Sequence, residues 1–179
     1  QVMVLSCGAL LPRPDLIELA KAHGGRILVP TGALLGLDAV IAAAEGTIHS
    51  VRMTTRKPPN GLIGAPHLVK NSISVEGLNT AKLVFSGSAR EAAAGFPANV
   101  NVAAALSLAG IGPDRTMIDI WADPAVDRNC HTIEVDSDSA RYKLSIENIP
   151  SENPKTGKNV ALSVLAALRK MHAPMAVGT

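Results

Sequence analysis

The side chain best suited to proton chemistry is His131, inside a strand-like stretch from Asn129 to Asp136. An imidazole titrates near neutral pH and can therefore take up and return protons during a reaction. Neighbouring side chains of a strand point to opposite faces, so His131 shares a face with Ile133 and Val135. Burial on that apolar face would favour the neutral base, whereas a nearby carboxylate would favour the charged form. The residues alone leave both states open, as well as a purely structural role.

The residues beside His131 allow fewer roles. Cys130 is adjacent in sequence but faces the other side of the strand, so a cysteine–histidine nucleophile pair is not expected. Asp123 precedes Pro124 and could either orient the imidazole or cap the turn that begins there.

Two further pairs of residues could bind carboxylates. Lys155 and Thr156 open the last predicted helix, where an ammonium, a hydroxyl and free backbone N–H groups could hold a carboxylate together. The alternative is a solvated lysine, although the helix dipole disfavours a cation at this end. Arg56 and Lys57, at the end of an alternating strand, could hold a second carboxylate.

Composition argues against several classes of protein. The 17 basic and 15 acidic residues nearly cancel and aromatic residues make up 2%, so nucleic acid is not an expected partner. No segment approaches the roughly 20 unbroken apolar residues of a membrane-spanning helix. The histidines other than His131 lack metal-ligand spacing, so no metal site is expected. Cys7 and Cys130 are too few for a disulfide framework, which favours a reducing cytoplasm.

The elements that must position these side chains fall into two parts. Residues 2–6 and 26–29 are predicted strands on either side of a helix that begins near Pro14 and ends at Gly24-Gly25. This strand–helix–strand unit is typical of a parallel α/β sheet, and its length allows only the tail of a doubly wound sheet.

The second part changes character after Gly46. Alternation predicts a strand with Val51, Met53 and Thr55 on one face, and a long loop follows over residues 57–79. Further strands are expected over residues 82–85, 117–122, 129–136 and 141–148, and helices over 33–44, 88–95, 99–110 and 155–171. The last helix is amphipathic and should lie on the sheet. The predicted fold class is α/β plus α+β, the tail of a doubly wound Rossmann sheet followed by a mixed or antiparallel sheet covered by helices.

Five short stretches occur along the chain in the same order as in the L-aspartate dehydrogenase family, and together they resemble that family. They are Val29–Ala33, Phe96–Ala103, Ala122–Pro124, Arg128–His131 and Asn153–Thr156. The resemblance implies a substrate-binding, catalytic and dimerisation domain over residues 33–179, like the C-terminal domain of glyceraldehyde-3-phosphate dehydrogenase. Residues 1–32 would then be the C-terminal remnant of a dinucleotide-binding domain.

The resemblance also implies a reaction, the NAD(P)-dependent oxidative deamination of L-aspartate to iminoaspartate. The imine would hydrolyse to oxaloacetate and ammonia or feed NAD biosynthesis. His131 matches the family's catalytic histidine, and Ala33 and Asn101 match its cofactor-contact positions. Asn101 could reach a nicotinamide carboxamide from the first turn of its helix, or simply cap that helix. Ala33 would contribute close backbone approach beside Gly32.

One departure from the family pattern limits these expectations. The Gly-rich dinucleotide fingerprint has no counterpart, because Gly24-Gly25 follows a helix instead of joining a strand to one. The chain alone should therefore bind NAD or NADP poorly. Alternatives are a non-catalytic dimerisation or ligand-binding domain, or a related amino-acid dehydrogenase with another substrate. A sheet covered on one face often finds its second cover in another subunit, which predicts a homodimer.

Overall fold

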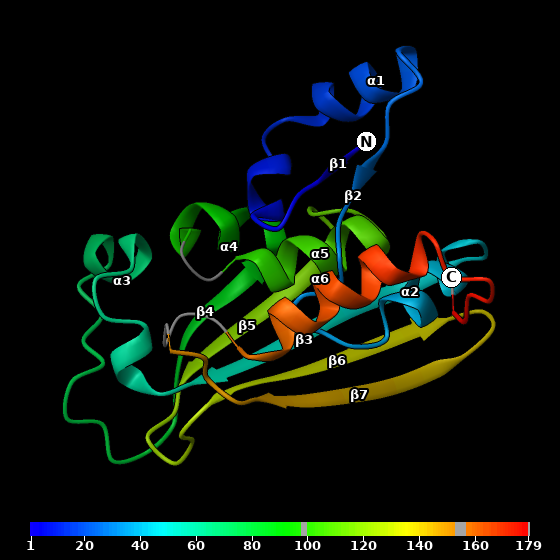
Figure 1. The fold of residues 1–179 in the computed structure, drawn as a ribbon. Helices are drawn as coiled ribbons and strands as arrows, with labels where there is room; N and C mark the ends of the chain where they lie inside the picture. Colours follow the sequence, from blue (N-terminus) through cyan, green and yellow to red (C-terminus); the bar gives the residue numbers. More distant parts are fainter. Residues whose placement is uncertain (98–99, 153–156, 179) are drawn as a thin grey trace.

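The main sheet has five strands in the order β4-β5-β3-β6-β7 (Figure 1). The computed structural model describes residues 1–97, 100–152 and 157–178. The strands are β3 (Ile48–Lys57), β4 (Lys82–Ser88), β5 (Thr116–Ala122), β6 (Asn129–Ser137) and β7 (Arg141–Asn148). Strand β3 pairs in parallel with β5 and antiparallel with β6. The sheet is therefore mixed, as predicted, with β3 at its centre.

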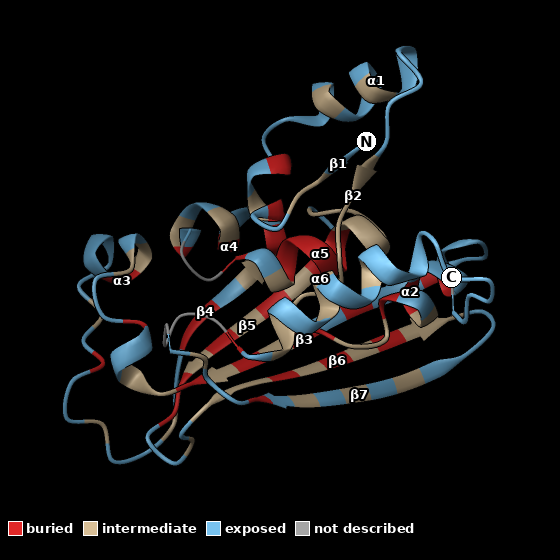
Figure 2. Ribbon diagram, in the orientation of Figure 1, coloured by how far each residue is buried: buried red, intermediate tan, exposed pale blue. Residues whose placement is uncertain are grey.

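Helices cover one face of this sheet. Figure 1 shows α2 (Leu37–Ala44), α5 (Asn101–Ala109) and α6 (Asn159–Lys170) on the same side of the strands. Helix α5 is the most deeply set, with five buried residues from Ala103 to Ser107, and Figure 2 shows the buried positions concentrated there and in the strands. Buried and half-buried residues alternate along β5 and β6, as expected for a sheet with one covered face.

The N-terminal unit extends away from the main sheet (Figure 1). Strands β1 (Val2–Met3) and β2 (Ile27–Leu28) pair in parallel. Along the chain they are separated by η1 (Cys7–Leu10) and α1 (Pro14–Ala22). Pro14 suits the first position of α1 because its missing N–H has no partner there in any helix. The strand–helix–strand prediction is confirmed, although both strands are shorter than the apolar runs that predicted them.

Three other elements differ from the predictions. Helix α2 begins at Leu37 instead of Ala33, because Gly36 adopts a left-handed φ of 66° that a helix cannot contain. The loop after β3 includes two short helices, η2 (Pro59–Gly61) and α3 (Pro66–Lys70). The packing predicted for the last helix was wrong, since α6 buries no residue and Leu165 is 50% exposed.

The predicted serine cap is present. Ser88 precedes α4 (Ala89–Gly95) and accepts a hydrogen bond from the backbone N–H of Glu91, whose carboxylate accepts one from the Ser88 backbone. This capping box fixes where β4 ends and α4 begins. Within the described ranges, no helix has both the length and the apolar composition needed to span a membrane.

Candidate functional site

His131 lies in a cavity of about 290 Å³ formed by segments far apart in the sequence. The walls come from residues 30–33, the end of β3, the start of α5, strand β6 and the end of β7. This volume is at the lower end of the range of about 300–1,000 Å³ typical of small-molecule sites. The cavity suits a compact substrate and the reactive end of a cofactor.

His131 is held in this cavity by the neighbouring strand. It lies directly opposite Thr55 in the β3–β6 pairing, and its Nδ1 is 3.0 Å from the Thr55 hydroxyl. This contact leaves Nε2 as the ring nitrogen available to a ligand. Only 3% of His131 is exposed, and its neighbours Ile133 and Val135 are buried on the same face, as the alternation predicted.

The protonation state of His131 follows from this burial. Burial and, to a smaller extent, the positive charge of Lys57 lower the pKa of His131 to about 3. The imidazole is therefore neutral at physiological pH and keeps a ring-nitrogen lone pair that can accept a proton. The structure thus favours the neutral base over the charged form that a nearby carboxylate would have stabilised.

Lys57 lines the same cavity and is also buried, with 5% of its surface exposed. It lies two residues beyond Thr55 on the same face of β3, so it is diagonal to His131 on the neighbouring strand. Such diagonal positions lie about 7–8 Å apart, within reach of a long side chain. Burial lowers the pKa of Lys57 to about 8.

Asn101 joins the N-terminal unit to the cavity. Its side-chain Oδ1 accepts a hydrogen bond from the Gly8 backbone N–H at 3.1 Å, and its backbone carbonyl accepts one from the Cys7 thiol. With Oδ1 engaged, the side-chain Nδ2 is the donor left for a ligand. The capping role considered for Asn101 is not seen, since α5 has no side-chain cap.

The turn at Gly32 and Ala33 is fixed from two sides. Asn148 Nδ2 donates to the Ala33 carbonyl at 2.9 Å, and Ser163 Oγ accepts from the Gly32 N–H at 3.0 Å. The buried Oδ1 of Asn148 has no partner among the described residues. The cavity wall therefore keeps one acceptor that these residues do not satisfy.

Arg56 and Asp123 lie on the opposite face of the sheet from His131. The Arg56 guanidinium is 2.7 Å from the Asp123 carboxylate and lies 5.1 Å above the Trp121 ring. This pairing holds the pKa of Asp123 below its usual value, and the other carboxylate oxygen accepts from the Ala125 N–H. Asp123 thus caps its turn, and the structure does not bring Arg56 into the cavity.

The remaining predicted site residues differ in whether the structure places them in the cavity. Ala33 and Asn101 line the cavity with His131. Lys155 and Thr156 lie outside the described residues. Lys57, which the sequence offered only as a partner of Arg56, is the basic residue that the fold places inside.

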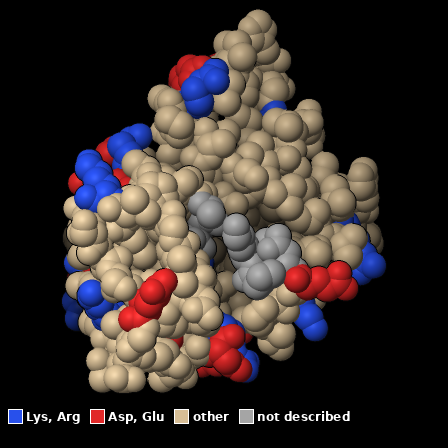
Figure 3. All heavy atoms as spheres, turned by 90° about the vertical axis from the view of Figure 1, so that its left-hand side faces the viewer, with Lys and Arg blue, Asp and Glu red and all other residues tan. Residues whose placement is uncertain are grey.

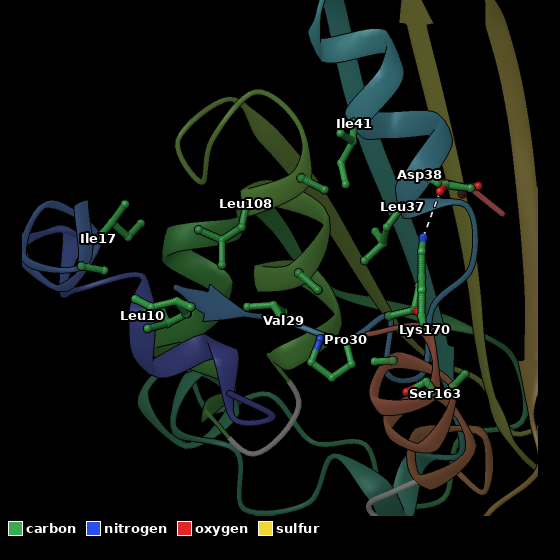
Figure 4. Close-up of a pocket in the computed structure, with 18 of the residues that line it drawn as sticks. Leu10, Ile17, Val29, Pro30, Leu37, Asp38, Ile41, Leu108, Ser163 and Lys170 are labelled. Carbon is green, nitrogen blue, oxygen red and sulfur yellow. Dashed lines mark hydrogen bonds between the residues drawn. The ribbon is translucent and has the colours of Figure 1, made fainter. Parts of the chain in front are cut away.

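A second, larger cavity of about 810 Å³ lies between the N-terminal unit and helices α2, α5 and α6. Figure 4 shows aliphatic side chains that line it, among them Leu10, Ile17, Leu37, Ile41 and Leu108. It contains neither His131 nor Lys57. The smaller cavity is therefore the one equipped for proton chemistry.

The charged side chains on one face of the molecule do not mark a second site. On the face drawn in Figure 3, acidic and basic side chains are interspersed and do not gather by sign. In the part of the chain that the structure describes, no group of three or more His, Cys, Asp or Glu residues could hold a metal ion.

Comparison with known proteins identifies aspartate dehydrogenases among the relatives of this chain. A family model described as "Aspartate dehydrogenase, C-terminal" matches residues 38–171. The L-aspartate dehydrogenase of Bradyrhizobium diazoefficiens is 64% identical over 99% of this chain and 63% of its own length. L-aspartate dehydrogenase 3 of Bordetella bronchiseptica is 63% identical over the whole chain and 66% of its own length. The chain thus spans slightly less than two thirds of both relatives.

A solved structure gives the same result for the fold. The crystal structure of aspartate dehydrogenase from Thermotoga maritima matches with a TM-score of 0.79 at 27% identity. The match covers 98% of this chain and 67% of that one. The predicted combination of a short parallel unit with a helix-covered mixed sheet is confirmed.

Proposed function

Because the chain belongs to the aspartate dehydrogenase family, we propose that the protein oxidises L-aspartate to iminoaspartate with a nicotinamide cofactor. The observation that carries this proposal is the buried, neutral His131 in a small cavity bounded by Ala33 and Asn101. The imine then takes up water to give oxaloacetate and ammonia. The link to NAD biosynthesis stays a prediction.

The cavity fits the reactive end of a nicotinamide cofactor. When bound, NAD or NADP supplies the ring that takes the hydride from the substrate Cα. Gly32 and Ala33 carry little or no side chain, which permits close approach of a flat ring to the backbone. The Nδ2 group of Asn101 is a hydrogen-bond donor and so matches a carboxamide oxygen. NAD and NADP have the same nicotinamide ring and carboxamide, so the proposal covers both cofactors.

The role of His131 in the proposed reaction is to move protons at Nε2. A neutral imidazole can accept a proton from the substrate ammonium, which leaves the amine lone pair free to form the C=N bond as hydride departs. Once that proton has passed to solvent, the neutral imidazole can accept a proton from the water that attacks the imine carbon and pass it to the amine nitrogen, which then leaves as ammonia. The Thr55 hydroxyl holds the ring in place for these steps.

The proposal extends to the organisation of the whole protein. Residues 1–32 would belong to the dinucleotide-binding domain and residues 33–179 to the substrate-binding domain, which the parallel β1–β2 pair supports. Among the described residues, no helix covers the other face of the sheet, and this supports a homodimer. Two free cysteines, Cys7 and Cys130, support a reducing cytoplasm. Lys155 and Thr156 stay as predicted carboxylate ligands, whereas Arg56 finds no support in the cavity geometry.

The test is an assay of the full-length protein with NAD or NADP and four amino acids: aspartate, glutamate, alanine and homoserine. We expect aspartate to be the preferred substrate, and His131→Ala to lower kcat by about 10²- to 10⁴-fold, the usual contribution of a positioned acid–base group. Equal rates on all four amino acids, or full activity of His131→Ala, contradict the proposal.

A further inference from the structure

Lys57 brings a positive charge into the cavity where His131 lies. Burying an ammonium is unfavourable unless something in the buried site stabilises its charge. Among the described residues that line the cavity, Lys57 is the one whose side chain is charged at neutral pH, and none carries a carboxylate. The cavity wall is therefore basic even though the chain as a whole is nearly neutral.

We infer that Lys57 binds a substrate carboxylate inside the cavity and thereby gives the enzyme its preference for dicarboxylic over monocarboxylic amino acids. The inference rests on the proposed function, because it assigns a residue to the recognition of that substrate. An ammonium has three N–H donors, so it can bind a carboxylate alongside contacts to the protein. In the dry cavity such a charge-assisted hydrogen bond is stronger than at the surface.

The strand geometry decides between the two neighbouring basic residues. Arg56 faces the other side of β3, is 43% exposed at its side chain and is bonded to Asp123. Lys57 faces inward with Thr55, next to the imidazole. Because side chains alternate strictly along a strand, only one of the two can reach the cavity.

The charge of the substrate matches that of the cavity. An amino acid with one carboxylate and one ammonium is neutral overall, whereas aspartate carries one additional negative charge. A basic cavity therefore favours aspartate over alanine of similar chain length, whichever of its carboxylates meets Lys57. A site that leaves its own polar group unpaired with the wrong substrate rejects that substrate more strongly than a site that only loses apolar contact with it.

Binding at Lys57 also prepares His131 for its role. The Lys57 charge contributes to the low pKa of His131 in the unliganded cavity. A carboxylate beside Lys57 offsets that charge and so makes it easier for the imidazole to accept a proton. Substrate recognition and proton acceptance are coupled through two side chains on neighbouring strands.

The experiment compares Lys57→Met with Lys57→Arg in the full-length protein, and Lys57→Gln serves if the methionine variant does not fold. Lys143→Met is the matched control, since Lys143 is an exposed lysine on β7 paired with Glu134, outside the cavity. Calorimetric titration with succinate and with propionate measures dicarboxylate and monocarboxylate binding without turnover. Steady-state kinetics with aspartate and alanine measure the same preference during catalysis.

We expect Lys57→Met to raise the Kd for succinate about 10- to 100-fold and to leave that for propionate within about twofold. The ratio of kcat/KM for aspartate to that for alanine should fall by the same factor, mainly through KM, with partial recovery in Lys57→Arg. Equal weakening of succinate and propionate, or unchanged binding of both, overturns the inference. Because the titrations need no turnover, they test Lys57 even if wild-type protein proves inactive on aspartate, which would overturn only the proposed function.

Discussion

Replacing Lys57 with methionine is expected to stabilise the folded protein at neutral pH while it weakens substrate binding. Methionine keeps an unbranched chain and removes the charge, so the substitution isolates the desolvation of the ammonium. Burial lowers the pKa of Lys57 from 10.5 to about 8. The difference of about 2.5 between these pKa values corresponds to about 3 kcal/mol, at about 1.36 kcal/mol for each pKa unit.

The pH dependence of this effect has a definite sign. Between about pH 8 and 10.5 the folded protein has released the Lys57 proton while the unfolded chain still holds it, so wild-type stability rises with pH. Below about pH 8 both states hold the proton and the full cost is present. The gain from Lys57→Met should therefore be about 3 kcal/mol at pH 7 and small above pH 10.

Urea unfolding at pH 7 and pH 10 measures this difference. Trp121 is the single tryptophan and lies on β5, so its fluorescence reports on unfolding of the main sheet. Lys143→Met should behave like wild type at both pH values because Lys143 is exposed. A variant at Lys57 that is less stable than wild type at pH 7, or a gain that is equally large at pH 10, refutes the reasoning.

The neutral His131 makes the fold sensitive to acid. Its pKa is about 3 when folded and 6.5 in the unfolded chain, so stability present above pH 6.5 is lost as pH falls toward 3. Urea titrations between pH 7 and 4 should show this loss in wild type and a smaller loss in His131→Gln. Thr55→Val keeps the side-chain shape but removes the hydrogen bond to His131 Nδ1. It should lower kcat roughly five- to tenfold, equivalent to about 1 kcal/mol. An unchanged kcat in steady-state kinetics would show that Thr55 does not position His131. Gly36→Ala should cost at least about 1–2 kcal/mol, because the residue has a left-handed φ and its new Cβ would meet Leu144. Thermal unfolding with Gly61→Ala as control, where a Cβ meets nothing within 4 Å, checks this last expectation.

Local pattern was sufficient to predict the inward face of the central strands. Val51, Met53 and Thr55 alternate with polar residues, and all three are buried in the structure. The same rule placed His131 on the apolar face of β6, where it is found. Period-two alternation is a property of the strand itself, so a sequence can reveal it without knowledge of the partner strands.

The composition of the site required long-range information. Thr55 and His131 are 76 residues apart, and nothing local indicates that their strands pair in this register. The sequence offered Arg56 and Lys57 together as carboxylate ligands, but alternation sends them to opposite faces, and only the pairing shows which face carries His131. The apolar stripe of α6 led to a wrong prediction, that this helix packs on the sheet. An amphipathic pattern indicates that one face of a helix is suited to burial, but it does not indicate which surface buries that face.

The position of the two buried side chains on β3 and β6 has a consequence for specificity. Both strands are flanked by neighbours on either side, so their backbone hydrogen bonds fix the register and with it the separation of Lys57 from His131. A shift of one residue on either strand would turn its side chain out of the cavity. Loop-borne groups could move apart to admit other ligands, whereas groups on paired central strands cannot. The depressed pKa of Lys57 corresponds to an expected cost of about 3 kcal/mol for burying its charge. In the proposed role of Lys57, a rigid site would let that charge act on one carboxylate at one distance from the imidazole.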